Sequence, residues 1–266
     1  GYTFSGWSRN DFTMPAENVT ITGSFTANGE TPYKVEHWQQ NLEDDGYTLA
    51  ETENLTGETD TTATANPKTY TGFAFDGTVE DTVASGNIAG DGSLVLKLYY
   101  TRDSYKVTYQ YTGKVPTGVS ELPAETTEKY GAAVTVAADA TAPGYTFSGW
   151  SRNDFTMPAE NVTITGSFTA NSNTEYTVRH HFQNILDDAY DADTAMLSET
   201  LSGTTDTLTA AAAKTVAGFT AQSFQQKNIA GDGSTVVDIY YNRNSYGVSY
   251  RYLNTPAGAS ALPAGA

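Results

Sequence analysis

Residues 1–28 read GYTFSGWSRNDFTMPAENVTITGSFTAN, and residues 144–171 read the same letters without a change. Self-similarity at a fixed period indicates a repeat architecture, in which each repeat is one small structural unit. Two further pairs of segments extend the match: PYKVEHWQQNLEDDGY (32–47) with EYTVRHHFQNILDDAY (175–190), and NIAGDGSLVLKLYYTRDSY (87–105) with NIAGDGSTVVDIYYNRNSY (228–246). The chain therefore repeats a unit of about 143 residues.

The repeat unit divides into two modules, here named A and B. The B module is expected at residues 31–103 and again at 174–244, and a complete A module at 104–171. Residues 1–28 are expected to be the C-terminal part of an A module and residues 245–266 the N-terminal part of another. The sequence is therefore expected to begin and end inside repeats of a longer array.

The composition favours several small cores over one large core. Hydrophobic residues make up 38% of the chain, below the roughly 45–50% usual in globular proteins. The net charge of −17 disfavours nucleic acid and anionic membranes as partners, because like charges repel. The chain has no cysteine, which excludes disulfides, thiolate metal sites and cysteine nucleophiles.

The strand signals dominate the sequence. In SYKVTYQY (104–111), in NVTITGSF (161–168) and in SLVLKLYY (93–100), apolar and polar residues alternate with the period of a half-buried strand. Asp-Gly pairs at 91–92 and 232–233 predict hairpin turns before the last B strands. One short helix is expected at residues 205–216, ended by Gly218. The predicted fold class is mostly β, α+β at most.

These segments resemble known bacterial surface repeats. The B module resembles the mucin-binding-protein (MucBP) repeat in its YKVEHWQ, LTGETD, KTYTGF and SGNIAGDG segments. The A module resembles the SHIRT repeats, and GYTFSGW with FTMPAENVTITGSF is similar to the Listeria–Bacteroides repeat of internalin-type proteins. The resemblance implies a linear, elongated array of small β-grasp-like (ubiquitin-like) modules from a wall-attached, Gram-positive surface protein. It does not establish mucin binding.

Aromatic residues supply the candidate core and the candidate contact sites. Core positions are expected at six alternating aromatic residues: Trp7, Trp150, Tyr105, Tyr109, Tyr246 and Tyr250. Trp38 has His181 as its repeat partner, so that position tolerates polarity and is expected at the surface. Trp38, with Tyr47, is the candidate for ligand contact.

Metal and cofactor signals are weak. His37 and His180 occupy the same repeat position, and His180 and His181 point to opposite faces of a strand, which favours a structural or surface role over metal ligation. The acidic loop at 187–193 is interpreted as a solvated loop, and Asp187, Asp188, Asp191 and Asp193 form a weak calcium candidate within it. No cofactor is expected.

The sequence therefore predicts a non-catalytic segment of a bacterial surface adhesin. No nucleophile elbow, zincin helix or Ser/His/Asp set occurs, and modules of this size rarely form the deep cleft that a glycosidase needs. The leading hypothesis is a rigid stalk, monomeric within the array, that projects an adhesive tip. The alternative is multivalent binding of host glycan, mucin or host protein by the repeats themselves. The expected location is extracellular and wall-attached, with signal peptide and anchor outside this stretch.

Overall fold

A computed structural model describes residues 1–190 and 197–265, which form strands and no helix. The prediction of a mostly β fold is confirmed, and none of the described residues belongs to a helix able to cross a bilayer. The chain divides into two compact units. Unit 1 comprises Gly1–Gln110, Pro123–Ala137 and Ser151–Thr165, and unit 2 comprises Tyr111–Leu122, Ala138–Trp150 and Gly166–Ala266.

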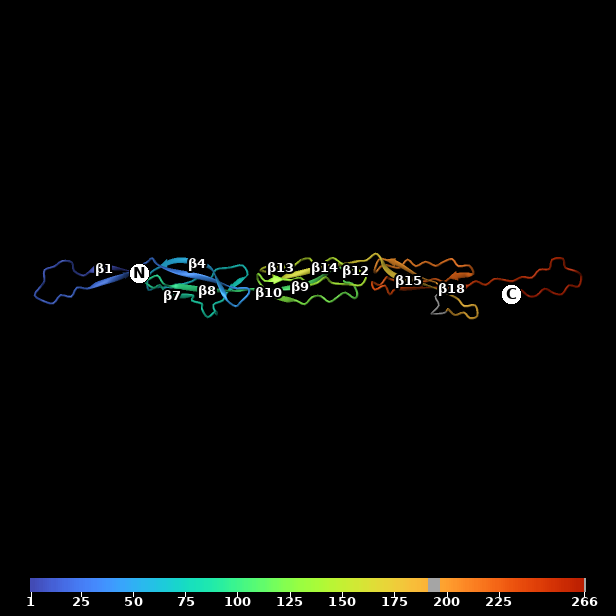
Figure 1. The fold of residues 1–266 in the computed structure, drawn as a ribbon, viewed down its shortest axis with the longest axis horizontal. Helices are drawn as coiled ribbons and strands as arrows, with labels where there is room; N and C mark the ends of the chain where they lie inside the picture. Colours follow the sequence, from blue (N-terminus) through green and yellow to red (C-terminus); the bar gives the residue numbers. More distant parts are fainter. Residues whose placement is uncertain (191–196, 266) are drawn as a thin grey trace. The chain divides into compact units, whose positions relative to one another are not determined.

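The first B module, in unit 1, is a four-stranded sheet with the order β4-β3-β8-β6. Two of its strands, β4 and β8, are labelled in Figure 1. Its strands are β3 (Thr31–Gln40), β4 (Tyr47–Gly57), β6 (Phe73–Phe75) and β8 (Val95–Arg102). The first and last strands, β3 and β8, are parallel neighbours at the centre, and β4 and β6 pair antiparallel at the two edges. A first and a last strand parallel at the centre is the strand order of a β-grasp-like module.

The core of this module lies on one face of that sheet. Leu96, Leu98 and Tyr100 alternate along β8 and are fully buried, as the period of two predicts. They pack with Val35 of β3 against a small second sheet, in which β5 (Thr62–Thr64) pairs with β7 (Ser85–Asn87). This small sheet occupies the crossover between the parallel strands, where the β-grasp folds usually carry a helix.

The second B module, in unit 2, repeats the arrangement. Its sheet has the order β16-β15-β18-β17, formed by β15 (Thr174–Phe182), β16 (Leu197–Gly203), β17 (Phe219–Ala221) and β18 (Val236–Arg243). Strands β15 and β18 are again parallel. Val237, Ile239 and Tyr241 are buried at the positions of Leu96, Leu98 and Tyr100.

The helix predicted at residues 205–216 is wrong. No helix forms there: a turn and an isolated bridge at Leu208 are followed by irregular backbone, and two of its N–H groups bond to core side chains. The N–H of Ala210 donates to the Tyr176 hydroxyl (3.0 Å), and the N–H of Lys214 donates to the Tyr241 hydroxyl (2.8 Å). Helix propensity of an alanine run is a weak preference that such tertiary hydrogen bonds override.

The predicted hairpins at the Asp-Gly pairs need a correction. Gly92 and Gly233 do adopt the left-handed φ that the turn requires, 73° and 76°. However, the Gly92 turn leads from β7 into β8, which belong to different sheets. It is a connecting turn, because an Asp-Gly pair specifies local backbone geometry and not which strands pair.

The A module contributes strands to both units. Its strands are β9 (Ser104–Thr112), β10 (Thr126–Lys129), β11 (Ala133–Val134), β12 (Tyr145–Phe147), β13 (Phe155–Thr156) and β14 (Val162–Ala170). In unit 1, β10 pairs with β9 and β11 pairs with β13, around the buried residues Val107, Met157 and Ile164. In unit 2, β12 pairs with β14. Residues 1–28 form a two-stranded ribbon, β1 (Tyr2–Trp7) with β2 (Gly23–Ala27).

Candidate functional site

A buried hydrogen-bond network occupies the core face of the first B module. His37 is fully buried on β3, with Nδ1 2.9 Å from the Tyr100 hydroxyl and Nε2 2.7 Å from Glu53 Oε1. The network reaches the surface at Lys68, whose Nζ lies 2.6 Å from a Glu51 oxygen and 3.3 Å from a Glu53 oxygen. His37 therefore has a structural role. It shares a face with Val35, two residues earlier, and this period-two signal could have placed it inside.

The same network recurs in the second B module. His180 is fully buried, with Nδ1 2.8 Å from the Tyr241 hydroxyl and Nε2 2.7 Å from Glu199 Oε1. Lys214 Nζ lies 2.8 Å from the other Glu199 oxygen. Both copies keep the histidine, the tyrosine, one glutamate and the lysine, whereas Leu197 stands where the first copy has Glu51.

The network determines the histidine tautomer. The Tyr100 hydroxyl accepts the backbone N–H of Lys68 (2.9 Å), which leaves its own proton for His37 Nδ1. Nδ1 is then the acceptor, so the Nε2–H donates to the Glu53 carboxylate. Each buried polar atom of the set thus has a partner, which is the condition under which a polar network stabilises a core.

The carboxyls of this network make stability sensitive to acid. The hydrogen bond from His37 holds the pKa of the Glu53 carboxyl below its usual value, and Lys68 and then Tyr70 do the same for the pKa of Glu51. In the second copy, Lys214 and then His180 lower the pKa of Glu199. These groups stabilise the fold above the ordinary glutamate pKa of about 4.5, and the contribution is lost as the pH falls through the lowered values.

We therefore expect the unfolding temperature to fall steeply between about pH 5 and pH 3. Differential scanning calorimetry at a series of pH values measures this, and the matched variants Glu53→Gln and Glu199→Gln should each flatten the slope. An unfolding temperature that is constant or rises over that interval would contradict the assignment.

The candidate contact residues Trp38 and Tyr47 lie together on the opposite face of the sheet. Both are half-buried and both contact Tyr99 of β8. Trp38 stacks on Tyr99, with ring centroids 6.1 Å apart, and Tyr47 meets Tyr99 edge-on at 5.0 Å. The Trp38 Nε1–H donates to Glu36 (3.1 Å). We name Trp38, Tyr47 and Tyr99 the aromatic platform.

The second B module has an equivalent platform in which some residue types differ. His181 stacks on Tyr240 (4.8 Å), and Tyr190 meets Tyr240 edge-on (5.1 Å). His181 Nε2 lies 2.8 Å from Asp238, so a ring nitrogen again contacts a carboxylate. The sequence reading missed Tyr99 and Tyr240, although the repeated Tyr-Tyr pair at 99–100 and 240–241 was a signal for them.

The predicted core aromatics of the complete A module are only partly enclosed. Trp150 is half-buried, stacked on Tyr111 (5.8 Å), and its Nε1–H donates to the Ala138 carbonyl (3.0 Å). Tyr105 and Tyr109 are also half-buried, and the Tyr109 hydroxyl accepts the Ala137 N–H (2.9 Å). The fully enclosed A-module positions are aliphatic or Met instead, such as Ile164 and Met157.

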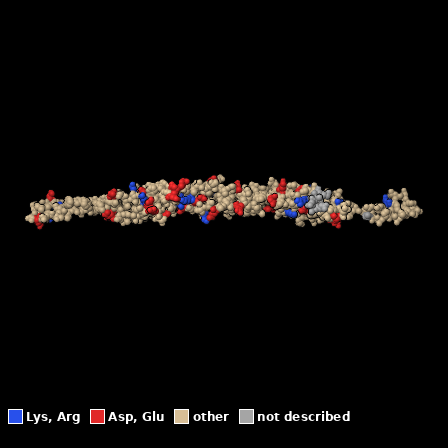
Figure 2. Space-filling view, turned by 60° about the horizontal axis from the view of Figure 1, so that its bottom comes forward, with Lys and Arg blue, Asp and Glu red and all other residues tan. Residues whose placement is uncertain are grey.

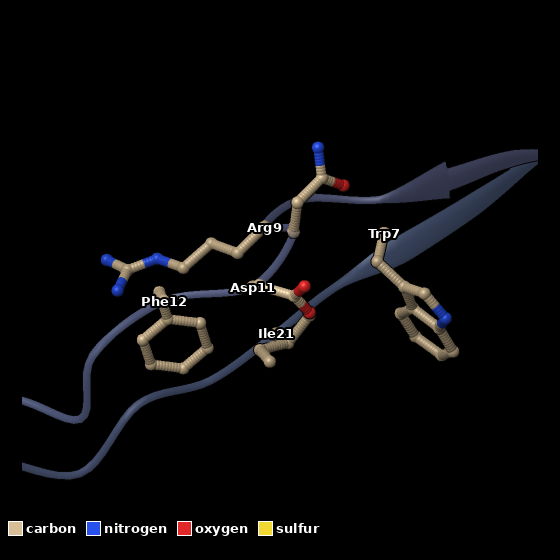
Figure 3. Close-up of a pocket in the computed structure, with 6 residues that line it drawn as sticks. Trp7, Arg9, Asp11, Phe12 and Ile21 are labelled. Carbon is tan, nitrogen blue, oxygen red and sulfur yellow. The ribbon is translucent and has the colours of Figure 1, made fainter.

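For Trp7, Tyr246 and Tyr250 the core prediction is wrong in this structure. Their exposed fractions are 64%, 72% and 50%. Among the described residues, strands β1 and β2 pair only with each other, and no second layer of the described chain covers Trp7. It lies at one end of an open hollow of about 910 Å³, with Phe12 at the other end and Asp11 and Ile21 between them (Figure 3). Residues 245–265 form no strand that could enclose the two tyrosines.

The calcium candidates do not form a site in the described residues. Asp187 Oδ1 accepts the Asn184 side-chain amide (2.9 Å) and the Ala189 N–H (3.0 Å), and Asp188 accepts the Gln183 amide (2.9 Å). Asp191 and Asp193 lie outside the described residues. Within residues 1–190 and 197–265, no group of three or more His, Cys, Asp or Glu side chains is placed to hold a metal ion.

Segment 144–145 contacts the second B module through closely packed backbone, and we name this the A–B joint. A Cβ atom on Gly144 would lie 2.4 Å from the Gly231 Cα, so the two glycines touch. The Gly144 carbonyl accepts the Asn171 N–H (2.9 Å) and the Thr205 hydroxyl (2.8 Å). Side chains add to the joint, since Asp206 accepts the Tyr145 hydroxyl and pairs with an A-module lysine.

The first B module has an equivalent A–B joint in unit 1. A Cβ on Gly1 would lie 2.2 Å from the Gly90 Cα, and the Asn28 N–H donates to the Gly1 carbonyl (2.8 Å). The Tyr2 hydroxyl donates to Asp60 (2.5 Å). Asp60 and its counterpart Asp206 both have a left-handed φ, 67° and 66°. The same unfavourable φ at the equivalent aspartate of both copies indicates that the surrounding contacts fix the backbone geometry of the joint.

A different contact set follows β8 within unit 1. The Arg102 guanidinium donates to the Gln40 carbonyl (2.8 Å) and to the Tyr130 carbonyl (2.9 Å), and stacks over Phe73 (4.8 Å). Asp103 adds two backbone bonds, since its N–H donates to Gly72 and its carbonyl accepts the Tyr130 N–H. The short connection at residues 101–104 is thus bonded on both sides.

Comparisons with known proteins match part of the chain. Residues 1–29 and 105–172 match the family model of the divergent InlB B-repeat domain, and these two ranges overlap the segments assigned above to the A module. A solved pair of Streptococcal High Identity Repeats in Tandem (SHIRT) domains, domains 3-4 of a cell surface protein, is similar at 17% identity. That match has a TM-score of 0.21 and covers 53% of this chain and 98% of the other. No curated protein matches.

Proposed function

We propose that this chain is a non-catalytic repeat segment of a bacterial surface adhesin and acts as a stalk. The single observation that carries the proposal is the A–B joint. Glycine backbones in contact, a shared set of hydrogen bonds and a strained aspartate occur at both copies. A joint built this way restricts rotation between neighbours, whereas a glycine-rich linker would permit it.

The matched names support a surface role. Both the InlB B-repeat and the SHIRT domains are repeat units by name, and the latter come from a cell surface protein. In this proposal the stalk is extracellular and attached to the cell wall, and its B modules are MucBP-like repeats. The net charge of −17 disfavours side-by-side collapse of modules, modestly at physiological salt.

Small-angle X-ray scattering tests the stalk directly. A compact chain of this length would have a radius of gyration of about 18 Å, and we expect a value about twice as large. A repeat of the measurement in 1 M NaCl is the control. Charge repulsion is screened in 1 M NaCl. The radius of gyration should therefore stay large if the joints keep the chain extended, and should decrease if charge repulsion does. A radius near the compact value at low salt would defeat the proposal.

A second candidate function is binding by the repeats themselves. The aromatic platform favours it, because stacked rings recur on the same sheet face in both B modules although the residue at position 38 changes to His at 181. The ligand in this alternative is a host glycan, mucin or protein, engaged weakly at each copy. A glycan array probed with the full chain tests the glycan form, and signal lost in a Trp38→Ala variant would support it.

A further inference from the structure

The aromatic platform of the first B module lies among carboxylates. Burial raises the pKa of Tyr47, and Asp76 and Asp45 raise it further. The pKa of Tyr99 is likewise raised by burial and then by Asp81 and Glu36. Asp76 lies beside the platform, since its N–H donates to the Tyr99 carbonyl (2.9 Å). Acidic side chains predominate over basic ones on the face drawn in Figure 2. Lys97 is the partner of Glu36 in the register of β3 and β8.

The second platform has the rings without the same charges. Gln222 stands at the position of Asp76. The Asp76 N–H donates to the Tyr99 carbonyl (2.9 Å), and the Gln222 N–H donates to the Tyr240 carbonyl (2.8 Å). The loop that carries Asp81 in the first copy is shorter in the second. Arg179 stands at the position of Glu36. Asp238 stands at the position of Lys97, so this strand pair keeps one carboxylate and one cation in both copies. The second copy therefore keeps the stacking but lacks the carboxylates of Asp76 and Asp81.

We propose that the first platform, Trp38 with Tyr47 and Tyr99, docks the cationic side chains of a basic polypeptide segment. Aromatic rings attract ammonium and guanidinium groups through their negative faces, and tryptophan does so most strongly. Carboxylates around the rings add charge complementarity, which guides association and selects partners. This inference names the partner class for the second candidate function, and it does not depend on the stalk.

The test is a titration of the full chain with a hexa-arginine peptide, followed by NMR of the backbone amides. The expected result is saturable shifts in residues 36–47 and 97–100. Trp38→Ala should raise the dissociation constant about two- to fivefold. Trp38→His, which installs the residue found in the second copy, should raise it similarly while the module stays folded. Exposed Asp81 offers a charge variant, Asp81→Asn, expected to weaken binding as well.

Two controls separate a docking site from general attraction to an acidic chain. His181→Ala alters the second platform, and Glu121→Gln removes one exposed charge outside the B modules. Neither variant should change the affinity. Shifts spread over the acidic surface, with equal affinities for Trp38→His, Asp81→Asn and Glu121→Gln, would overturn the proposal. Glycan-array binding together with no peptide binding would overturn it too, and leave the broader binding function standing.

Discussion

The Tyr100→Phe variant is expected to destabilise the first B module by about 2–4 kcal/mol. The ring remains, but the hydroxyl that accepts the Lys68 N–H and donates to His37 is lost. The buried His37 Nδ1 and the half-buried Lys68 N–H then lose their partner, and each such group costs about 1–3 kcal/mol when buried. Hydrogen exchange read by mass spectrometry measures the loss, because it reports residues 31–103 separately from the rest of the chain.

The chain contains matched controls for this variant. Tyr241→Phe removes the same hydroxyl in the second copy, so the same loss should appear in residues 174–244 and nowhere else. Tyr99→Phe changes the neighbouring tyrosine, for whose hydroxyl no hydrogen bond is found among the described residues, and should cost less than about 1 kcal/mol. Equal effects of Tyr99→Phe and Tyr100→Phe would show that the network does not carry the stability assigned to it.

The Gly231→Ala variant is expected to open the A–B joint in unit 2. The added Cβ would lie 2.0 Å from the Pro143 carbonyl oxygen and 2.8 Å from its carbon, and backbone cannot yield as a flexible side chain can. The segments must separate, which breaks the bonds of the joint and should cost about 2–4 kcal/mol. Amide exchange at Asn171 and Thr205 should therefore accelerate about a hundredfold.

A different glycine serves as the control for the joint. A Cβ on Gly29 meets no atom within 4 Å, so Gly29→Ala should leave exchange unchanged at every amide of the joint. The core of the second B module, represented by Ile239 and Tyr241, should keep its protection in Gly231→Ala. Unchanged exchange at Asn171 in that variant would mean that the glycine contact does not hold the joint closed.

Much of the fold follows from local pattern. Alternation along residues 93–100 predicts that Leu96, Leu98 and Tyr100 share the core face of β8, because a strand turns successive side chains to opposite faces. It does not predict the burial of Tyr99 on the other face. The alanine run at 210–213 favours a helix by composition, but two distant tyrosine hydroxyls accept hydrogen bonds from the backbone N–H groups of Ala210 and Lys214. No local signal reports such partners.

The candidate site was harder to predict for a related reason. The residue type differs between Trp38 and His181, so the sequence suggests that this position has no common role in the two copies. In the structure, both side chains are stacked rings with a ring nitrogen beside a carboxylate. The carboxylate moves from Glu36 on β3 to Asp238 on β18. A compensating exchange between paired strands is visible only once the register is known. The exposure of Trp7 depends likewise on which strands lie beside it.

The parallel pairing of β3 and β8 has a mechanical consequence. The chain enters the first B module at the start of β3 and leaves it at the end of β8, and these two points lie at opposite ends of the same strand pair. A pulling force along the chain therefore acts parallel to the strands and loads their evenly spaced hydrogen bonds together. Sliding requires those bonds to break at once, whereas an antiparallel pair pulled from one end would unzip bond by bond. Strands β15 and β18 have the same geometry, so each B module resists tension in shear.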